Sequence, residues 1–154
     1  MTNLEKAVCE FNCISKSMGY EITPPYTGEF IQYDFGRGIE HGQSDFWHQY
    51  YAFVSISNGL FADGHTFYGV NDSGDPETGK LIEFNQALEV MGLEDESMMG
   101  RIVIGGNNTD TFYYDTRSGK WESCDRIGTN NIWESCDTLA QLIETQNNML
   151  KDSQ

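Results

Sequence analysis

The sequence is poor in basic residues, with nine Lys and Arg against 24 Asp and Glu and a formal net charge of −15. Nucleic acids and anionic lipids are bound through Lys and Arg, so this deficit argues against nucleic acid and against a membrane surface as partners. A strongly negative field attracts basic proteins and speeds their association. The sequence therefore favours a basic protein partner, with simple solubility as the alternative reading of the charge.

Long apolar runs are also lacking. No segment approaches the roughly 18 consecutive apolar residues of a membrane-spanning helix, and charged side chains interrupt the first 18 residues where a signal peptide would be apolar. The four cysteines form no C-x-x-C pair and are expected to be reduced. They are Cys9, Cys13, Cys124 and Cys136. We expect a cytoplasmic protein that is a monomer or a weak dimer.

Motifs for catalysis and for cofactors are missing as well. His41, His48 and His65 have no H-E-x-x-H spacing, and no G-x-S-x-G nucleophile turn is present. Gly105-Gly106 follows an apolar segment but lacks the remainder of a phosphate-binding motif. The acidic stretch 71–77 departs from the order of oxygen ligands in a calcium loop. We expect no enzyme activity, no metal and no cofactor; an unrecognised hydrolase or metal enzyme is the competing hypothesis.

What is present suits one folded domain over residues 1–154. The chain is 38% hydrophobic and 13% aromatic, and a domain of about 150 residues can bury a sufficient core without metals or disulfides. Apolar spacing of 3–4 residues predicts helices, and β-prone runs between turn signals predict strands. The expected helices are 3–18, a short one at 29–34, 45–58, 81–91 and 137–150; the expected strands are 60–61, 66–70, 101–105, 111–115 and 120–122.

One short sequence occurs twice. Trp-Glu-Ser-Cys-Asp stands at 121–125 and again at 133–137. Two copies 12 residues apart do not make a repeat architecture, which needs longer periods and more copies. The first copy is expected at the end of a strand and the second at the start of a helix, so we interpret the repetition as coincidence or a small local duplication.

Acidic segments are the candidates for contact with a partner. Charge runs are usually solvated faces, so each has a plain structural explanation beside the functional one. Interfaces also need aromatic anchors, most of which we expect in the core. The candidate partner-binding residues are Asp72, Asp75, Glu77, Glu94, Asp95, Glu96 and Asp110.

Several segments occur in an order found in one known family. They are Phe46-Trp47-x-x-Tyr50-x-x-Phe53-x-x-Ile56-Ser57-Asn58-Gly59-Leu60, then Asp63-Gly64 and Phe67-Tyr68-Gly69, then Ile102-Val103-Ile104-Gly105-Gly106, Asp110-x-Phe112-Tyr113-Tyr114-Asp115 and Asp137-x-Leu139-x-x-Leu142-Ile143. This order, over about residues 20–146, resembles the SUKH superfamily of bacterial immunity proteins and a yeast cell-wall-assembly regulator. Residues 42–45 depart from the Leu-Pro that members often carry there, and an Asp at the helix start can replace it.

The resemblance implies an α+β fold in which helices flank a central, largely antiparallel sheet, with no catalytic residues. It also implies a bacterial immunity protein that binds and blocks a cognate polymorphic toxin, often a nuclease. A nuclease binds phosphate groups through Lys and Arg and is commonly basic. A basic toxin would attract an inhibitor of net charge −15. The alternative is an intracellular regulatory scaffold with no toxin partner, as the yeast relative suggests.

Overall fold

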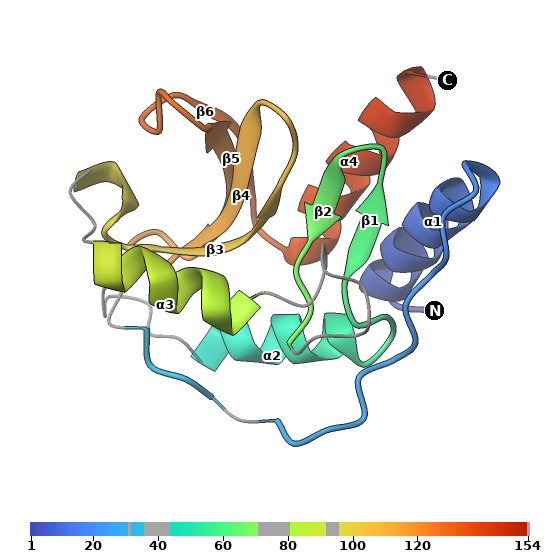
Figure 1. The fold of residues 1–154 in the computed structure, drawn as a ribbon, viewed down its shortest axis with the longest axis horizontal. Helices are drawn as coiled ribbons and strands as arrows, with labels where there is room; N and C mark the ends of the chain where they lie inside the picture. Colours follow the sequence, from blue (N-terminus) through green and yellow to red (C-terminus); the bar gives the residue numbers. More distant parts are fainter. Residues whose placement is uncertain (31, 36–43, 71–80, 92–95, 154) are drawn as a thin grey trace.

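Six antiparallel strands form one sheet in which each strand pairs with the next along the chain (Figure 1). The computed structural model describes residues 1–30, 32–35, 44–70, 81–91 and 96–153. The strands are β1 (Leu60–Ala62), β2 (His65–Phe67), β3 (Arg101–Gly106), β4 (Asp110–Asp115), β5 (Lys120–Asp125) and β6 (Ile132–Cys136). The helices are α1 (Asn3–Ser17), α2 (Ser44–Val54), α3 (Leu81–Met91) and α4 (Leu139–Asp152), with a 3-10 turn η1 (Glu96–Met98).

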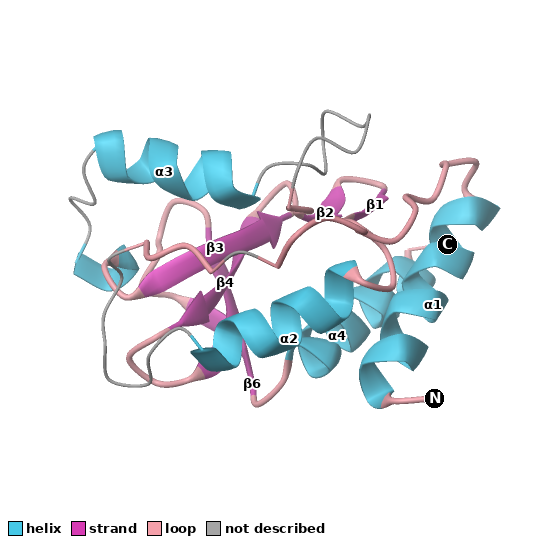
Figure 2. Cartoon of the chain, turned by 90° about the horizontal axis from the view of Figure 1, so that it is seen from below, coloured by secondary structure: helices cyan, strands magenta, loops and turns pink. Residues whose placement is uncertain are grey.

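Helices lie on both faces of the sheet, which confirms the expected α+β class. Figure 2 shows α3 on one side of β3 and β4 and α2 and α4 on the other. The larger core lies on the α2 and α4 side, where the rings of Phe46 and Trp121 stack with centroids 5.6 Å apart. Aromatic side chains bury a large apolar area each, so this layer supplies much of the stabilisation. Among the described helices, none combines the length and the apolar composition that a membrane crossing requires.

Local hydrogen bonds explain where helices begin and how they are fixed. Thr2 and Glu5 form a capping box at the start of α1, and Thr138 and Gln141 form one at the start of α4. The side-chain amide of Asn147 donates to the carbonyl of Ala7 at 3.0 Å, which joins α4 to α1. Both helices are therefore fixed in register with each other.

The side chain of Asn85 on α3 makes the two backbone hydrogen bonds that a neighbouring strand would make with Val103 on β3. Its side-chain amide donates to the carbonyl of Val103 at 2.7 Å and accepts from the N–H of Val103 at 2.8 Å. Strand β2 pairs with β3 at Gly105 and Gly106 only, so the backbone groups of Val103 lie beyond the end of that pairing. A fully buried asparagine supplies the donor and the acceptor that the backbone needs there.

Two of the expected helix boundaries were wrong for a shared reason. No helix forms at residues 29–30 and 32–34; the carbonyl of Glu29 accepts from the Tyr26 hydroxyl, and the ring of Phe30 packs 4.7 Å from Tyr51 on α2. Helix α2 also ends at Val54 instead of 58, because the N–H of Tyr26 donates to the Val54 carbonyl. In both places the segment around Tyr26 packs along α2 and takes hydrogen bonds that helices would use.

The two copies of the Trp-Glu-Ser-Cys-Asp sequence pair with each other in neighbouring strands, contrary to the expectation that the second copy begins a helix. The second copy lies in β6, not at the start of a helix, and it pairs with the first copy in β5. Glu122 is opposite Ser135, and Ser123 is opposite Glu134. Antiparallel pairing of two identical sequences produces this exchange of residue types, so the two copies share one geometry.

Candidate partner-binding surface

A bulge in the hairpin of β5 and β6 exposes a tryptophan. Ser123 pairs with Glu134, but the next residue of β5, Cys124, pairs with Ile132, so the register leaves Trp133 without a partner on β5. A bulge of this kind redirects a side chain. Trp133 is 62% exposed.

The indole of Trp133 is nevertheless held in place. Its Nε1 donates to Oδ1 of Asp125 at 2.8 Å, and the side-chain amide of Asn131 donates to Oδ2 of the same carboxylate at 3.2 Å. The backbone N–H of Asp125 in turn donates to the carbonyl of Asn131. The ring is thus both exposed and oriented, which lowers the entropy lost when it binds a partner.

Three carboxylates share the face of the sheet that Trp133 borders. Asp110 and Asp125 are opposite each other on β4 and β5, and Glu134 follows on β6, where the Ser123 hydroxyl donates to its Oε2 at 2.7 Å. Within the described ranges, none of the three has a Lys or Arg side chain at ion-pair distance. Like charges opposite each other in a sheet are unfavourable, and a cation would relieve them.

These side chains surround a shallow hollow of about 460 Å³. It is lined by Thr109, Asp110, Asp125, Trp133, Glu134 and Met149. Met149 on α4, 40% exposed, lines the hollow, and two further apolar side chains are exposed elsewhere on the hairpin: Ile127 at 98% and Ile132 at 47%. An aromatic anchor with apolar neighbours and charged groups around it is typical of protein interfaces. We name Asp110, Asp125, Trp133, Glu134 and Met149 the carboxylate–tryptophan surface.

No family model matches the chain, and no curated protein or solved structure matches it either. Function is therefore inferred from the geometry of the described side chains and from the sequence itself.

A network of three buried side chains and the exposed Ser135 supports the hairpin from the opposite face of the sheet. Arg101, 3% exposed, donates from Nη1 to the carbonyl of Thr129 at 2.6 Å, and its guanidinium lies 4.1 Å from the centre of the Tyr113 ring. The Tyr113 hydroxyl donates to Oε1 of Glu122 at 3.0 Å, and the Ser135 hydroxyl donates to Oε2 at 2.6 Å. Burial raises the pKa of Tyr113 well above its usual value, so the phenol remains a donor.

Only one acidic residue predicted from the sequence belongs to the carboxylate–tryptophan surface. That residue is Asp110, which is 8% exposed. Glu96 lies in η1 beside the start of β3, at the end of the β3–β4 pair opposite to Asp110, so the structure does not bring the two together. The remaining five candidates lie outside the described residues: Asp72, Asp75, Glu77, Glu94 and Asp95.

Asp125, Trp133 and Glu134 were not among the predicted site residues. The repeated Trp-Glu-Ser-Cys-Asp sequence was the available signal, since two β-prone copies joined by a short polar segment also fit a hairpin. The bulge that exposes Trp133 has no comparable signature in the sequence.

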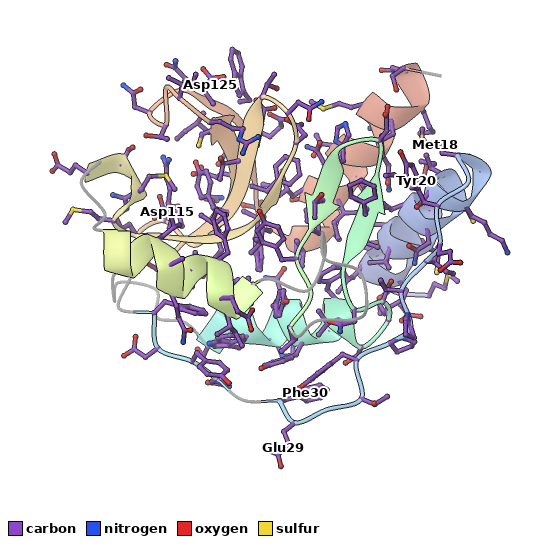
Figure 3. All side chains as sticks on the ribbon, in the orientation of Figure 1. Met18, Tyr20, Glu29, Phe30, Asp115 and Asp125 are labelled. Atoms are coloured by element: carbon purple, nitrogen blue, oxygen red, sulfur yellow. The ribbon has the colours of Figure 1, made fainter. Side chains whose placement is uncertain are left out.

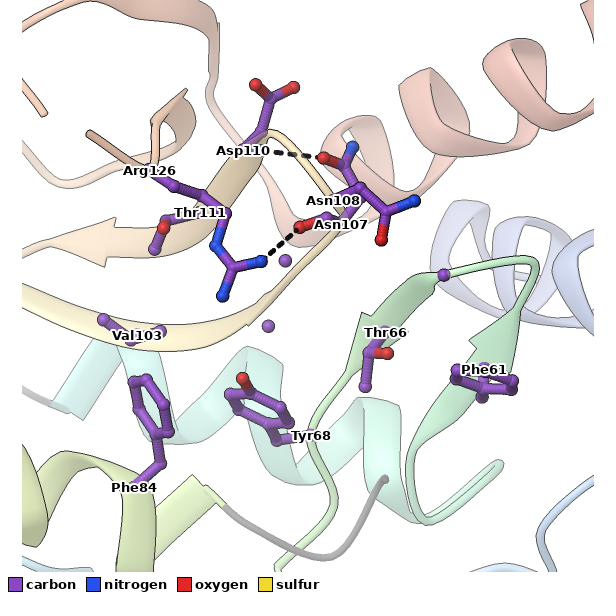
Figure 4. A pocket seen from close by; sticks show the side chains of 13 residues that line it. Phe61, Thr66, Tyr68, Phe84, Val103, Asn107, Asn108, Asp110, Thr111 and Arg126 are labelled. Carbon is purple, nitrogen blue, oxygen red and sulfur yellow. Dashed lines mark hydrogen bonds between the residues drawn. The ribbon is translucent and has the colours of Figure 1, made fainter. Parts of the chain in front are cut away.

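A second hollow, of about 310 Å³, lies on the other face of the sheet beside α3 (Figure 4). The rings of Tyr68 and Phe84 form one wall with centroids 5.4 Å apart, and Arg126 donates from Nη1 to the carbonyl of Asn107 at 3.2 Å at the opposite wall. The Asn107 side chain accepts from the N–H of Asp110 at 2.7 Å and so fixes the turn that places Asp110 at both hollows.

Both hollows present hydrogen-bonding and apolar groups to a bound molecule. Their described linings pair no Ser or Cys with a histidine. Across the part of the chain that the structure describes, no three His, Cys, Asp or Glu side chains are placed to hold a metal ion. The ring of His65 is engaged with the side chain of Gln146 at 2.8 Å. Fixed carboxylates can accept hydrogen bonds from cationic side chains, and an exposed indole beside them can pack against the apolar stems of those side chains.

Proposed function

We propose that this chain is a non-enzymatic immunity protein of the SUKH type that binds a basic toxin through the carboxylate–tryptophan surface. The observation that carries the proposal is Trp133, 62% exposed and held by Asp125 among carboxylates without a described cationic partner. The family resemblance of the sequence and the net charge of −15 support the same function.

The physical mechanism is occupation of a cationic cleft. A nuclease presents Lys and Arg to phosphates, and the negative charge of Asp110, Asp125 and Glu134 at the hollow attracts the same donors. The charge of the whole chain raises the rate of encounter, while Trp133 supplies buried area in the complex. Aromatic anchors of this kind commonly contribute about 2 kcal/mol or more to binding.

The test is co-expression with the toxin domain encoded beside this chain's gene, scored by growth and by a stable complex. Wild-type protein should restore growth. Trp133→Ala should weaken the complex about thirtyfold, the equivalent of about 2 kcal/mol, and Asp110→Asn with Asp125→Asn should weaken it further. Asparagine at 125 retains an acceptor for the indole and loses the one that the Asn131 amide uses, so the double variant removes two charges and one hydrogen bond while the Trp133 contact can persist.

The matched control changes the same number of charges elsewhere. Glu29 and Asp125 lie at opposite sides of the molecule (Figure 3), and Glu21 and Glu29 are both exposed. Glu21→Gln with Glu29→Gln should leave protection intact. Equal loss from both double variants would contradict a localised surface. A stable complex with a host protein and no protection from any toxin would favour the regulatory scaffold.

A further inference from the structure

The two edges of the sheet differ in how they are covered. At β1 the Ser15 hydroxyl of α1 donates to the carbonyl of Phe61 at 2.7 Å, so a helix covers that edge. Strand β6 forms the other edge, and within the described ranges no strand pairs with it on the side away from β5. An edge strand presents a row of backbone donors and acceptors that can pair with another chain.

The residues of β6 do little to prevent such pairing. The strand contains no Pro and no Lys, the residues that commonly block an edge. Its single charged side chain, Glu134, is engaged by Ser123 within the sheet. Ile132 and Trp133 are exposed along it, at 47% and 62%. The strand therefore offers both hydrogen-bonding groups and apolar surface to an incoming chain.

We propose that the partner adds an extended, basic segment to the sheet along β6. The inference rests on the proposed function and specifies how the partner binds. Side chains of an incoming strand alternate between the two faces of the sheet. On one face they meet Glu134 and, one strand further, Asp125; on the other they meet Ile132. A segment that alternates Lys or Arg with apolar residues fits both faces.

Charge complementarity decides among occupants of this edge. A second copy would pair β6 with β6, which brings together two chains of net charge −15 and places their Glu134 side chains near one another. A basic segment meets the opposite condition, because the carboxylates of the surface lack described cationic partners. The pairing of strands supplies affinity from the backbone, and the side chains supply specificity.

The test uses a synthetic octapeptide of alternating Lys and Val with blocked ends, and the same peptide with every internal amide N-methylated. Both carry the same charge and side chains, but only the first can extend a sheet. The first should shift the amide resonances of residues 132–136 and slow their hydrogen exchange, and methylation should weaken binding at least about tenfold. Equal binding of the two peptides would overturn strand addition and leave side-chain docking on the surface intact.

Two matched variants separate the remaining outcomes. Ile132→Lys places a positive charge in the edge strand, whereas Ile127→Lys makes the same change at the tip of the same hairpin, at a side chain 98% exposed. Ile132→Lys should weaken peptide binding at least about tenfold, and Ile127→Lys should change it less than about threefold. No peptide binding at the hairpin would contradict the proposed function as well. A wild-type dimer that Ile132→Lys dissociates would overturn the proposal in favour of a second copy.

Discussion

Ser135 donates from Oγ to Oε2 of Glu122 at 2.6 Å. In the corresponding pair, where the strands exchange roles, Ser123 donates from Oγ to Oε2 of Glu134 at 2.7 Å. The two bonds cross the β5–β6 hairpin at consecutive positions, so they lie on opposite faces of the sheet. The first belongs to the network around Arg101 and the second to the carboxylate–tryptophan surface. The repeated pentapeptide thus links the support of the hairpin to its candidate binding face.

Ser135→Ala should lower the free energy of unfolding by about 0.5–1.5 kcal/mol. The reason is that Oε2 of Glu122, a side chain only 6% exposed, loses its hydroxyl donor. Urea unfolding measures the effect, and a double-mutant cycle with Glu122→Gln isolates the coupling between the two residues. Additive effects in that cycle would show that the two side chains do not interact.

Asn85→Ala should be more damaging, with a loss of about 2–4 kcal/mol. It removes both hydrogen bonds to the backbone of Val103 and leaves a buried N–H and a buried carbonyl without partners. Hydrogen exchange at the Val103 amide should accelerate together with the loss in urea stability. If the Val103 amide were protected from exchange as well as it is in the wild type, the hydrogen bond from this amide to Asn85 would not be the source of its protection.

Acid should weaken the fold partly through Asp115. Burial raises the pKa of its carboxyl, but hydrogen bonds from Arg117, both 3.0 Å from the guanidinium, outweigh burial and hold the pKa below its usual value. A lowered folded-state pKa gives stability that is present above the unfolded value of about 3.9 and lost as the pH falls through the folded value.

Asp115→Asn should therefore destabilise the protein near neutral pH, and the difference from wild type should shrink below about pH 4. Urea unfolding of both proteins between pH 7 and about pH 3 provides the comparison. Asp152→Asn, an exposed change near the end of α4, is the control and should show no such trend. A difference that stays constant with pH would remove Asp115 as a source of acid sensitivity.

The cysteines should differ sharply in reactivity. Burial raises the pKa of Cys124 to about 11 despite the nearby Arg101, and the side chain is fully buried, whereas Cys13 on α1 is exposed. A thiol reagent at pH 8 should label Cys13 quickly and Cys124 only on unfolding, because the thiolate is the reactive form. Cys13→Ser should remove the fast phase. A fast phase that survives in this variant and maps to Cys124 would contradict the packing around Arg101.

Regular elements were predictable where one local pattern dominates. The apolar spacing at 81–91 correctly predicted α3 and both of its ends. The β-prone runs after Gly100 correctly predicted that β3, β4 and β5 follow one another as strands. Prediction failed where distant segments decide the outcome. The end of α2 at Val54 depends on the N–H of Tyr26, and the exposure of Trp133 depends on a register shift opposite Ser123. Asp110 was identified by its charge, while Asp125 joins it through the pairing of β4 with β5 and Glu134 through the pairing of β5 with β6.

We propose above all that a localised anionic surface around Trp133 captures a basic partner. The association rate constant with the purified toxin domain, measured at low and at physiological salt, tests it most directly. Asp110→Asn with Asp125→Asn should slow association at low salt by about tenfold and flatten its salt dependence, while Glu21→Gln with Glu29→Gln should behave as wild type. An unchanged rate constant in the first variant, or equal slowing in both, would contradict the claim.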